Sequence, residues 1–107
     1  MIEKLVDQIE ARFRELSEQM SDPEVIGDRE RYAEVGRSYS ALERAHGLAV
    51  EYRRAADDAA GARELLAEDG DDPELRAMLQ ASEERLAELE EEIRLAMVER
   101  DPTTTRT

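Results

Sequence analysis

Apolar side chains recur at steps of three and four positions through most of this chain. Over the first 20 residues this spacing places them on one face of a helix. The series ends near Ser21, and Asp22 with Pro23 is a pair suited to cap and begin a further helical turn. We therefore predict one helix over residues 1–20 and a short helical turn over residues 23–28. The first series comprises Ile2, Leu5, Val6, Ile9, Phe13, Leu16 and Met20.

A second and longer helix is predicted to begin at Asp28, which is placed to cap it. Its apolar positions alternate steps of three and four, as a seam between helices requires, and the same register includes His46 and Arg53. Three glycines each weaken this helix by about 1 kcal/mol relative to alanine, so we expect a bend near Gly47 or a break near Gly61. The seam comprises Tyr32, Val35, Tyr39, Leu42, Ala49, Ala56, Leu65 and Leu66.

A clear break follows in the segment EDGDDP, residues 68–73. Asp72 is placed to cap a third helix that Pro73 begins, and this helix is expected to end near Arg100. Its seam has the most regular spacing in the chain, because steps of four and three alternate over three heptads. This third seam comprises Leu75, Leu79, Ser82, Leu86, Leu89, Ile93 and Ala96.

The predicted fold is an all-α, elongated antiparallel bundle of three main helices. A short helical turn follows the first helix, and residues 1–101 form one domain. The helices are about 20, 35 to 40 and 27 residues long, and the first and third are expected to pack against the second. Charged residues make up 40% of the chain and aromatic residues 4%, which suits narrow seams between helices better than a thick core.

The net charge of −13 argues against a general grip on nucleic acid or on anionic membranes, because both need a basic surface. The chain contains no cysteine and no apolar run near the ~20 residues that span a bilayer, and its start lacks a signal-peptide core. We therefore expect a cytoplasmic protein with no membrane partner.

Few side chains have the spacing that chemistry requires. Glu43 and His46 match the Glu-x-x-His spacing of carboxylate-bridged metal bundles, but such sites need a second copy and none occurs. His46 is better read as a seam histidine, and the acidic run at residues 90–92 as a solvated helix face. We expect no enzyme activity, catalytic residue, cofactor, metal or small-molecule substrate.

A group of arginines is the only candidate for partner binding. Residues 28–54 are close to electrically neutral, whereas both flanks are acidic. Ion pairs within the helix would explain these arginines without any partner. As a docking face for protein or RNA, the candidate residues are Arg37, Arg44, Arg53 and Arg54.

The order of the segments resembles the N-terminal helical domain of bacterial peptide chain release factor 1, a class I translation termination factor. The first helix and turn lead into RERYAEVGRSYSALE, and DPELRAM follows the acidic break. SEERLAELEEEI then leads into an Arg-Asp-Pro junction at residues 100–102. The resemblance covers residues 1–102, and it rests on the ordered set of segments and not on one diagnostic motif.

This resemblance implies a role in translation termination at UAA and UAG codons. In the family, a Pro-x-Thr loop reads the codon and a Gly-Gly-Gln loop triggers hydrolysis of peptidyl-tRNA, and neither occurs in this chain. The family's N-terminal bundle contacts the GTPase-associated region of the large ribosomal subunit. The expected partner is therefore the ribosome, through protein and rRNA of that region, and the expected state is a monomer.

The last six residues, 102–107, read Pro-Thr-Thr-Thr-Arg-Thr and are expected to be disordered. Similar factors continue with Pro-Asn-Asp-Asp-Lys-Asp at this point, and deletion of one C from GC-rich codons for that segment gives the observed residues. We therefore hypothesise a frameshift at Pro102. The alternative to a release factor domain is a free-standing acidic coiled-coil adaptor or structural protein.

Overall fold

The computed structural model describes residues 2–70 and 72–99, and helices account for nearly all of them. Helix α1 spans Ile2–Ser21, α2 spans Pro23–Gly27, α3 spans Arg29–Asp69 and α4 spans Pro73–Glu99. No strand occurs in these two ranges. The all-α prediction and the short helical turn after the first helix are thereby confirmed. The tail at residues 102–107, with its frameshift hypothesis, lies outside the described residues.

The helix boundaries follow the predicted caps. The Asp22 carboxylate accepts a hydrogen bond from the backbone N–H of Glu24 at 2.9 Å, and Asp28 accepts one from Arg31 at 3.2 Å. These bonds satisfy N–H groups that have no partner within the helix. Asp72 does the same at the start of α4. Gly70 ends α3 in the left-handed conformation, with φ of 80°, which a residue without Cβ adopts at little cost.

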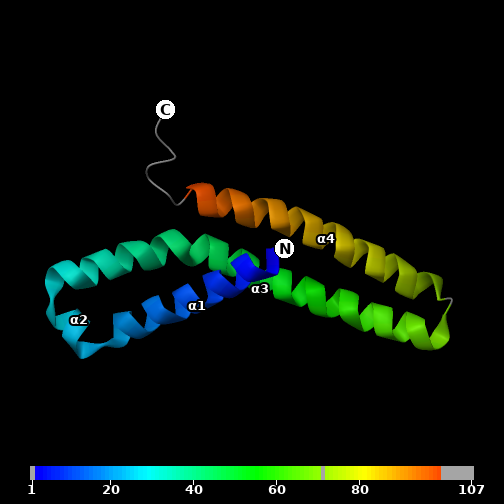
Figure 1. Cartoon of the computed structure of the whole chain (residues 1–107), viewed down its shortest axis with the longest axis horizontal. Coiled ribbons are helices and arrows are strands. Elements are labelled where there is room, and N and C mark those ends of the chain that lie inside the picture. Colours follow the sequence, from blue (N-terminus) through cyan, green and yellow to red (C-terminus); the bar gives the residue numbers. More distant parts are fainter. Residues whose placement is uncertain (1, 71, 100–107) are drawn as a thin grey trace.

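The two outer helices pack against different halves of α3. Figure 1 shows α1 running antiparallel to the first half of α3, with α2 at the turn, and α4 running antiparallel to the second half. The molecule measures 60 × 37 × 18 Å. Its radius of gyration of 18.2 Å exceeds the ~13 Å expected for a compact globule of this length. The molecule is elongated because the α1–α3 hairpin and the α3–α4 hairpin extend in opposite directions from the middle of α3.

The core lies mainly where the two hairpins overlap near the middle of α3. Every position of the first predicted seam is buried or packs against the core cluster. Leu89 and Ile93 near the end of α4 are fully buried in the same cluster. The first and third helices therefore both pack on the second, as predicted. The largest fully buried side chains are Val6, Ile9, Leu16, Val25, Leu42, Leu89 and Ile93.

The predicted seam of α3 is wrong at two positions. Tyr32 is 39% exposed and Leu65 is 51% exposed. The sequence predicted one seam, but α1 and α4 pack on different sides of α3, which therefore has two buried stripes. The second stripe passes through the half of α3 that lies along α4, and Leu65 is outside it. This stripe contains Leu48, Tyr52, Ala55, Ala59 and Ala62.

The expected break near Gly61 is also wrong, because α3 is one continuous helix of 41 residues. Its neighbours Ala59 and Ala62 are buried, and alanine is the strongest helix former, so packing and propensity together offset the glycine. The ribbon of α3 curves along its length and does not break (Figure 1).

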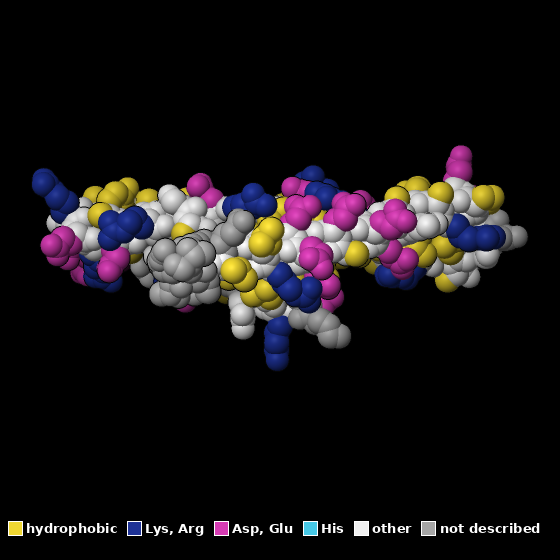
Figure 2. Space-filling model, turned by 90° about the horizontal axis from the view of Figure 1, so that it is seen from above, with side chains coloured by type: hydrophobic (Ala, Val, Ile, Leu, Met, Phe, Trp, Pro, Cys, Tyr) yellow, Lys and Arg dark blue, Asp and Glu magenta, His cyan; other side chains and the backbone are white. Residues whose placement is uncertain are grey.

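Charges of both signs cover the outside of the bundle. Figure 2 shows acidic and basic side chains interspersed along the molecule, with small apolar areas between them. None of the helices in the described ranges combines the length and the apolar character needed to cross a bilayer.

Candidate interaction face

Of the four candidate arginines, Arg53 is used inside the molecule. Its guanidinium donates two hydrogen bonds to the Glu10 carboxylate, both at 3.0 Å, and another to Asp7, so it joins α3 to α1. The bonds to Glu10, followed by the bond to Asp7, raise the pKa of Arg53 further above its ordinary value. A two-pronged arginine–carboxylate pair fixes both distance and orientation. Arg53 therefore sets how α1 lies on α3.

A neighbouring contact strengthens the same junction. The Tyr52 hydroxyl donates a hydrogen bond to the Glu3 carboxylate of α1 at 3.1 Å, and its ring is buried. Burial, followed by this bond, raises the pKa of Tyr52 to about 12. The phenol is therefore held in its neutral form, in which it can donate.

The junction between α3 and α4 also has ion pairs. Arg85 contacts Glu51 at 2.6 Å across the junction, and Arg63 contacts Glu83 at 2.9 Å. Arg85 also reaches Glu88 of its own helix, and the hydrogen bonds to Glu51 and Glu88 raise its pKa. These exposed pairs add little free energy each, but they fix the alignment of the two helices.

The other three candidate arginines have a different environment. Arg37, Arg44 and Arg54 are exposed on α3, and none has an ion-pair or hydrogen-bond partner within the part of the chain that the structure describes. Arg37 and Arg44 are seven residues apart, which places both on one side of the helix. Ion pairing within α3, the explanation that needs no partner, therefore does not account for these three arginines.

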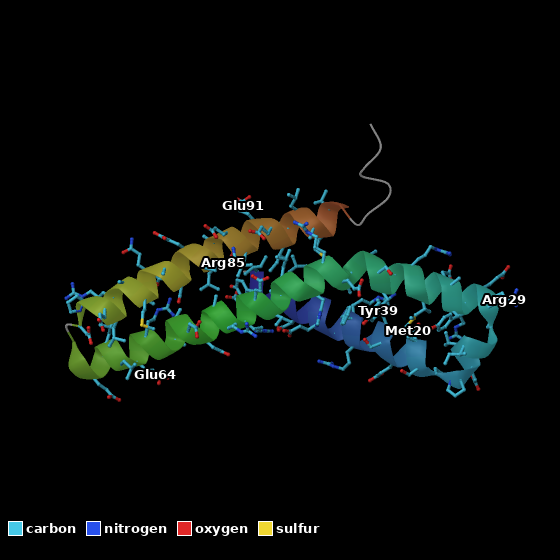
Figure 3. The ribbon with its side chains drawn as sticks, turned by 180° about the vertical axis from the view of Figure 1, so that it is seen from behind. Met20, Arg29, Tyr39, Glu64, Arg85 and Glu91 are labelled. Atoms are coloured by element: carbon cyan, nitrogen blue, oxygen red, sulfur yellow. The ribbon has the colours of Figure 1, made fainter. Side chains whose placement is uncertain are left out.

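Arg29 is another exposed arginine of this kind on α3, and the sequence reasoning missed it. It opens α3 and likewise has no partner among the described side chains. In Figure 3 it lies at the α2 end of the molecule, far from Glu64 and Arg85 on the opposite arm. Arg29 lies seven residues before Gly36, the neighbour of Arg37, and this spacing is what places Arg29 on the same side of α3 as Arg37 and Arg44. We name Arg29, Arg37 and Arg44 the arginine face.

His46 lies in an aromatic stack. The Phe13 ring of α1 lies 3.8 Å from the His46 ring, at an interplanar angle of 11°, and 4.6 Å from the Tyr39 ring. This confirms the placement of His46 on the seam. Within the described residues, no three histidine or carboxylate side chains gather in a way that would hold a metal ion.

An open apolar groove of about 820 Å³ lies beside the arginine face. Figure 3 shows Met20 of α1 and Tyr39 of α3 lying close together between the two ribbons, and these side chains form one wall. Arg37 is the single charged residue among those that line it. The sequence does not predict this groove. Small residues of α3 form it, and only the fold places them together. The α3 residues that line it are Ala33, Gly36, Arg37, Tyr39, Ser40 and Ala41.

Comparison with known families gives a match over most of the chain. The model of the PCRF domain matches residues 9–107. The match includes all of the arginine face and the groove, since both lie between Met20 and Arg44.

Individual relatives agree with this match. The chain is 37% identical over 101 residues to peptide chain release factor 1 of Oleidesulfovibrio alaskensis, which is 91% of this chain and 28% of the relative. It is 38% identical over 110 residues to the protein of the same name from Thermus thermophilus, covering 99% of this chain and 30% of that protein. The chain is 39% identical to peptide chain release factor 1 of Rubrobacter xylanophilus, and the match covers 92% of this chain and 28% of that protein. The chain thus spans less than a third of the length of these relatives, and no solved structure matches it significantly.

Proposed function

The chain belongs to the PCRF domain family, and from this membership we propose that it is the helical domain of a bacterial peptide chain release factor 1. The whole factor would direct termination at UAA and UAG codons. The observation that carries the proposal is the identity of 37 to 39% with proteins of that name over nearly the whole of this chain. The domain itself would hold the factor on the ribosome, in the cytoplasm.

We propose that the contact lies at the GTPase-associated region of the large subunit. The acidic charge of −13 favours a protein component of that region over a broad rRNA surface. The elongated shape, 60 Å long, supports a role as an arm that reaches a site away from the decoding centre. The described residues leave the arginine face free for such a contact.

This domain alone is not expected to catalyse peptide release. Its grooves are open and lined by ordinary surface residues, and general acid–base chemistry needs a positioned group in a water-excluding site. The chain also lacks the Gly-Gly-Gln segment that the family uses for hydrolysis. Its contribution would therefore be affinity and placement.

A chimeric release factor tests the proposal directly. The Thermus thermophilus protein would have its matching segment of 110 residues replaced by this chain. We expect the chimera to release peptide from ribosomes stopped at UAA and UAG but not at UGA, and a version without the segment to bind ribosomes more weakly. A folded chimera that binds ribosomes no better than the deleted version would overturn the proposal.

The free-standing coiled-coil adaptor has less support. An adaptor of that kind needs an apolar seam left open for a second chain. Here the seams of α1 and α4 are both packed on α3 of the same chain. We therefore propose a monomer, and light scattering coupled to size exclusion measures this.

A further inference from the structure

The arm formed by α1, α2 and the first half of α3 lacks a third long helix. Along the second half of α3, α4 lies on the side of the helix that α1 leaves open, and near the middle the three helices overlap (Figure 1). Toward the α2 end, α3 is covered by α1 and by the short helix α2, and α4 does not reach it. The groove beside Met20 and Tyr39 lies in this part of the arm. The groove is shallow and open to solvent, so it can accept one side of a helix but does not enclose a ligand.

The wall of this groove is apolar and held in place. Tyr39 packs on Phe13, with ring centroids 4.6 Å apart, and Phe13 also stacks on His46. Tyr32 lies one helical turn before Gly36 and is exposed, so the apolar strip continues toward α2. The wall is therefore preformed, which lowers the entropic cost of binding.

Gly36 of α3 is one of the residues that line the groove. A Cβ added to Gly36 would meet no atom within 4 Å, so the absence of a side chain there is not required by packing inside the molecule. Glycine weakens a helix interior by about 1 kcal/mol relative to alanine. What the glycine does provide is room for side chains of another molecule to approach the backbone of α3.

The charges around the groove indicate the chemistry of its occupant. The chain has 28 acidic and 15 basic residues, yet none of the described residues that line the groove carries a carboxylate. Arg37 lines the groove without an ion-pair partner in the described ranges, and Arg29 and Arg44 lie on the same side of α3. Arg37 also lines a second depression, together with Asp28, Glu30 and Glu34. The Tyr39 hydroxyl also has no hydrogen-bond partner among the described residues and can donate to a carboxylate.

We propose that this groove binds an acidic amphipathic helix of a partner protein. The apolar side of that helix packs over Gly36 against Met20 and Tyr39, and its carboxylates meet Arg37 and Arg44. The partner's helix would pack on α1 and α3 in this arm. A three-helix arrangement would result, like the one that α4 forms with α1 and α3 in the middle of the molecule. This is the recognition mode in which an amphipathic helix lies in an apolar groove. Arg37 and Arg44 belong to the arginine face that the ribosome contact proposed above would also use, but the helix-binding test needs no ribosomes and can fail independently of that contact.

The test uses the whole chain and labelled synthetic peptides. One peptide is an amphipathic helix with leucines on one side and glutamates beside them, and the other carries lysines in place of the glutamates. Fluorescence anisotropy is expected to show the glutamate peptide binding at least about tenfold more tightly, and the preference should shrink as salt rises. Equal binding of the two peptides would overturn the assignment of an acidic partner.

Two leucine variants locate the site. Gly36→Leu fills the groove, whereas Gly61→Leu adds the same side chain to the same helix in the other arm, where a Cβ also meets no atom within 4 Å. Gly36→Leu is expected to weaken binding of the glutamate peptide by about tenfold or more, and Gly61→Leu to leave it unchanged. Melting curves of both variants check that each one folds. An equal loss in both variants, or in neither, would overturn the proposal.

A third variant separates a protein partner from RNA. Arg37→Glu reverses the charge at the rim of the groove. It should weaken binding of the glutamate peptide and strengthen binding of the lysine peptide. A labelled single-stranded RNA is expected to bind weakly in all variants, because the chain is acidic overall. RNA that binds more tightly than the glutamate peptide, and that is released by Arg37→Glu but not by Gly36→Leu, would assign the surface to nucleic acid and refute the helix proposal.

Discussion

Three glycines inside α3 give the sharpest test of how this helix is stabilised. Gly36, Gly47 and Gly61 have no tertiary contact that a methyl group would disturb, since an added Cβ meets nothing within 4 Å at any of them. Alanine at each site should therefore increase the free energy of unfolding. The gain has two sources, because alanine favours the helix and also restricts the unfolded chain.

The size of the effect follows from helix geometry. Each substitution contributes about 0.5 to 1 kcal/mol. The sites are separated by about 16 and 21 Å along the helix axis, which is far enough for their effects to add. The triple variant should then gain about 1.5 to 3 kcal/mol. With an unfolding entropy of about 0.22 kcal/mol/K for a chain of this size, the midpoint temperature rises by about 7 to 13 °C.

Gly70→Ala is the matched control. Gly70 has φ of +80°, and a side chain in that conformation costs about 1 to 2 kcal/mol, so this variant should melt lower. Helical circular dichroism measures the midpoints, and urea unfolding tests whether the slope with denaturant is unchanged. A triple variant that melts at or below the parent would refute the reasoning, and would mean that α3 needs its glycines for curvature or for contacts that the structure does not contain.

Three further predictions concern the core, one tyrosine and the tail. Ile93→Ala should cost about 3 kcal/mol because Ile93 is fully buried at 0% exposure, whereas Leu95→Ala, at 53% exposure, should stay within about 0.5 kcal/mol; chemical unfolding measures both, and similar losses would contradict the described core. The pKa of Tyr52 is raised to about 12 from 10.0, so the stability that its neutral phenol contributes is complete below pH 10 and is lost as the pH rises through 12. Ultraviolet titration of phenolate should show one late component that Tyr52→Phe removes, and its persistence in that variant would assign it elsewhere. Sequencing of the coding DNA should reveal release-factor codons in a second frame beyond Pro102, and their absence would end the frameshift hypothesis.

Periodicity and capping residues were enough to predict the helices but not the surfaces that they leave open. Proline and aspartate pairs specify helix starts locally, so Asp22, Asp28 and Asp72 were placed correctly. The second buried stripe of α3 was largely missed, because alanine suits an exposed helix position as well as a buried one. Ala59 is fully buried, but nothing in its neighbourhood in the sequence shows this.

The candidate site shows the same limit. The sequence grouped Arg53 with Arg37 because both lie on α3, yet the fold pairs Arg53 with two carboxylates of α1 and leaves Arg37 exposed. The seam register had placed Arg53, and not Arg37, on the packed side of the helix, but it did not show which carboxylates of α1 would lie opposite Arg53, because this depends on tertiary contacts. The groove was missed for a similar reason, since one of the residues that line it is a glycine that the sequence marks only as a weak point of the helix.

The continuity of α3 has a mechanical consequence. One helix of 41 residues runs between the two turns and is about 61 Å long, close to the longest dimension of the molecule. It behaves as a beam braced by α1 over one half and by α4 over the other, with both braces overlapping at the midpoint where bending stress is greatest. The spacing between the two ends is therefore nearly fixed. Force or displacement applied at the α2 end would reach the α3–α4 turn as a rotation of the whole body, and little would be absorbed between them.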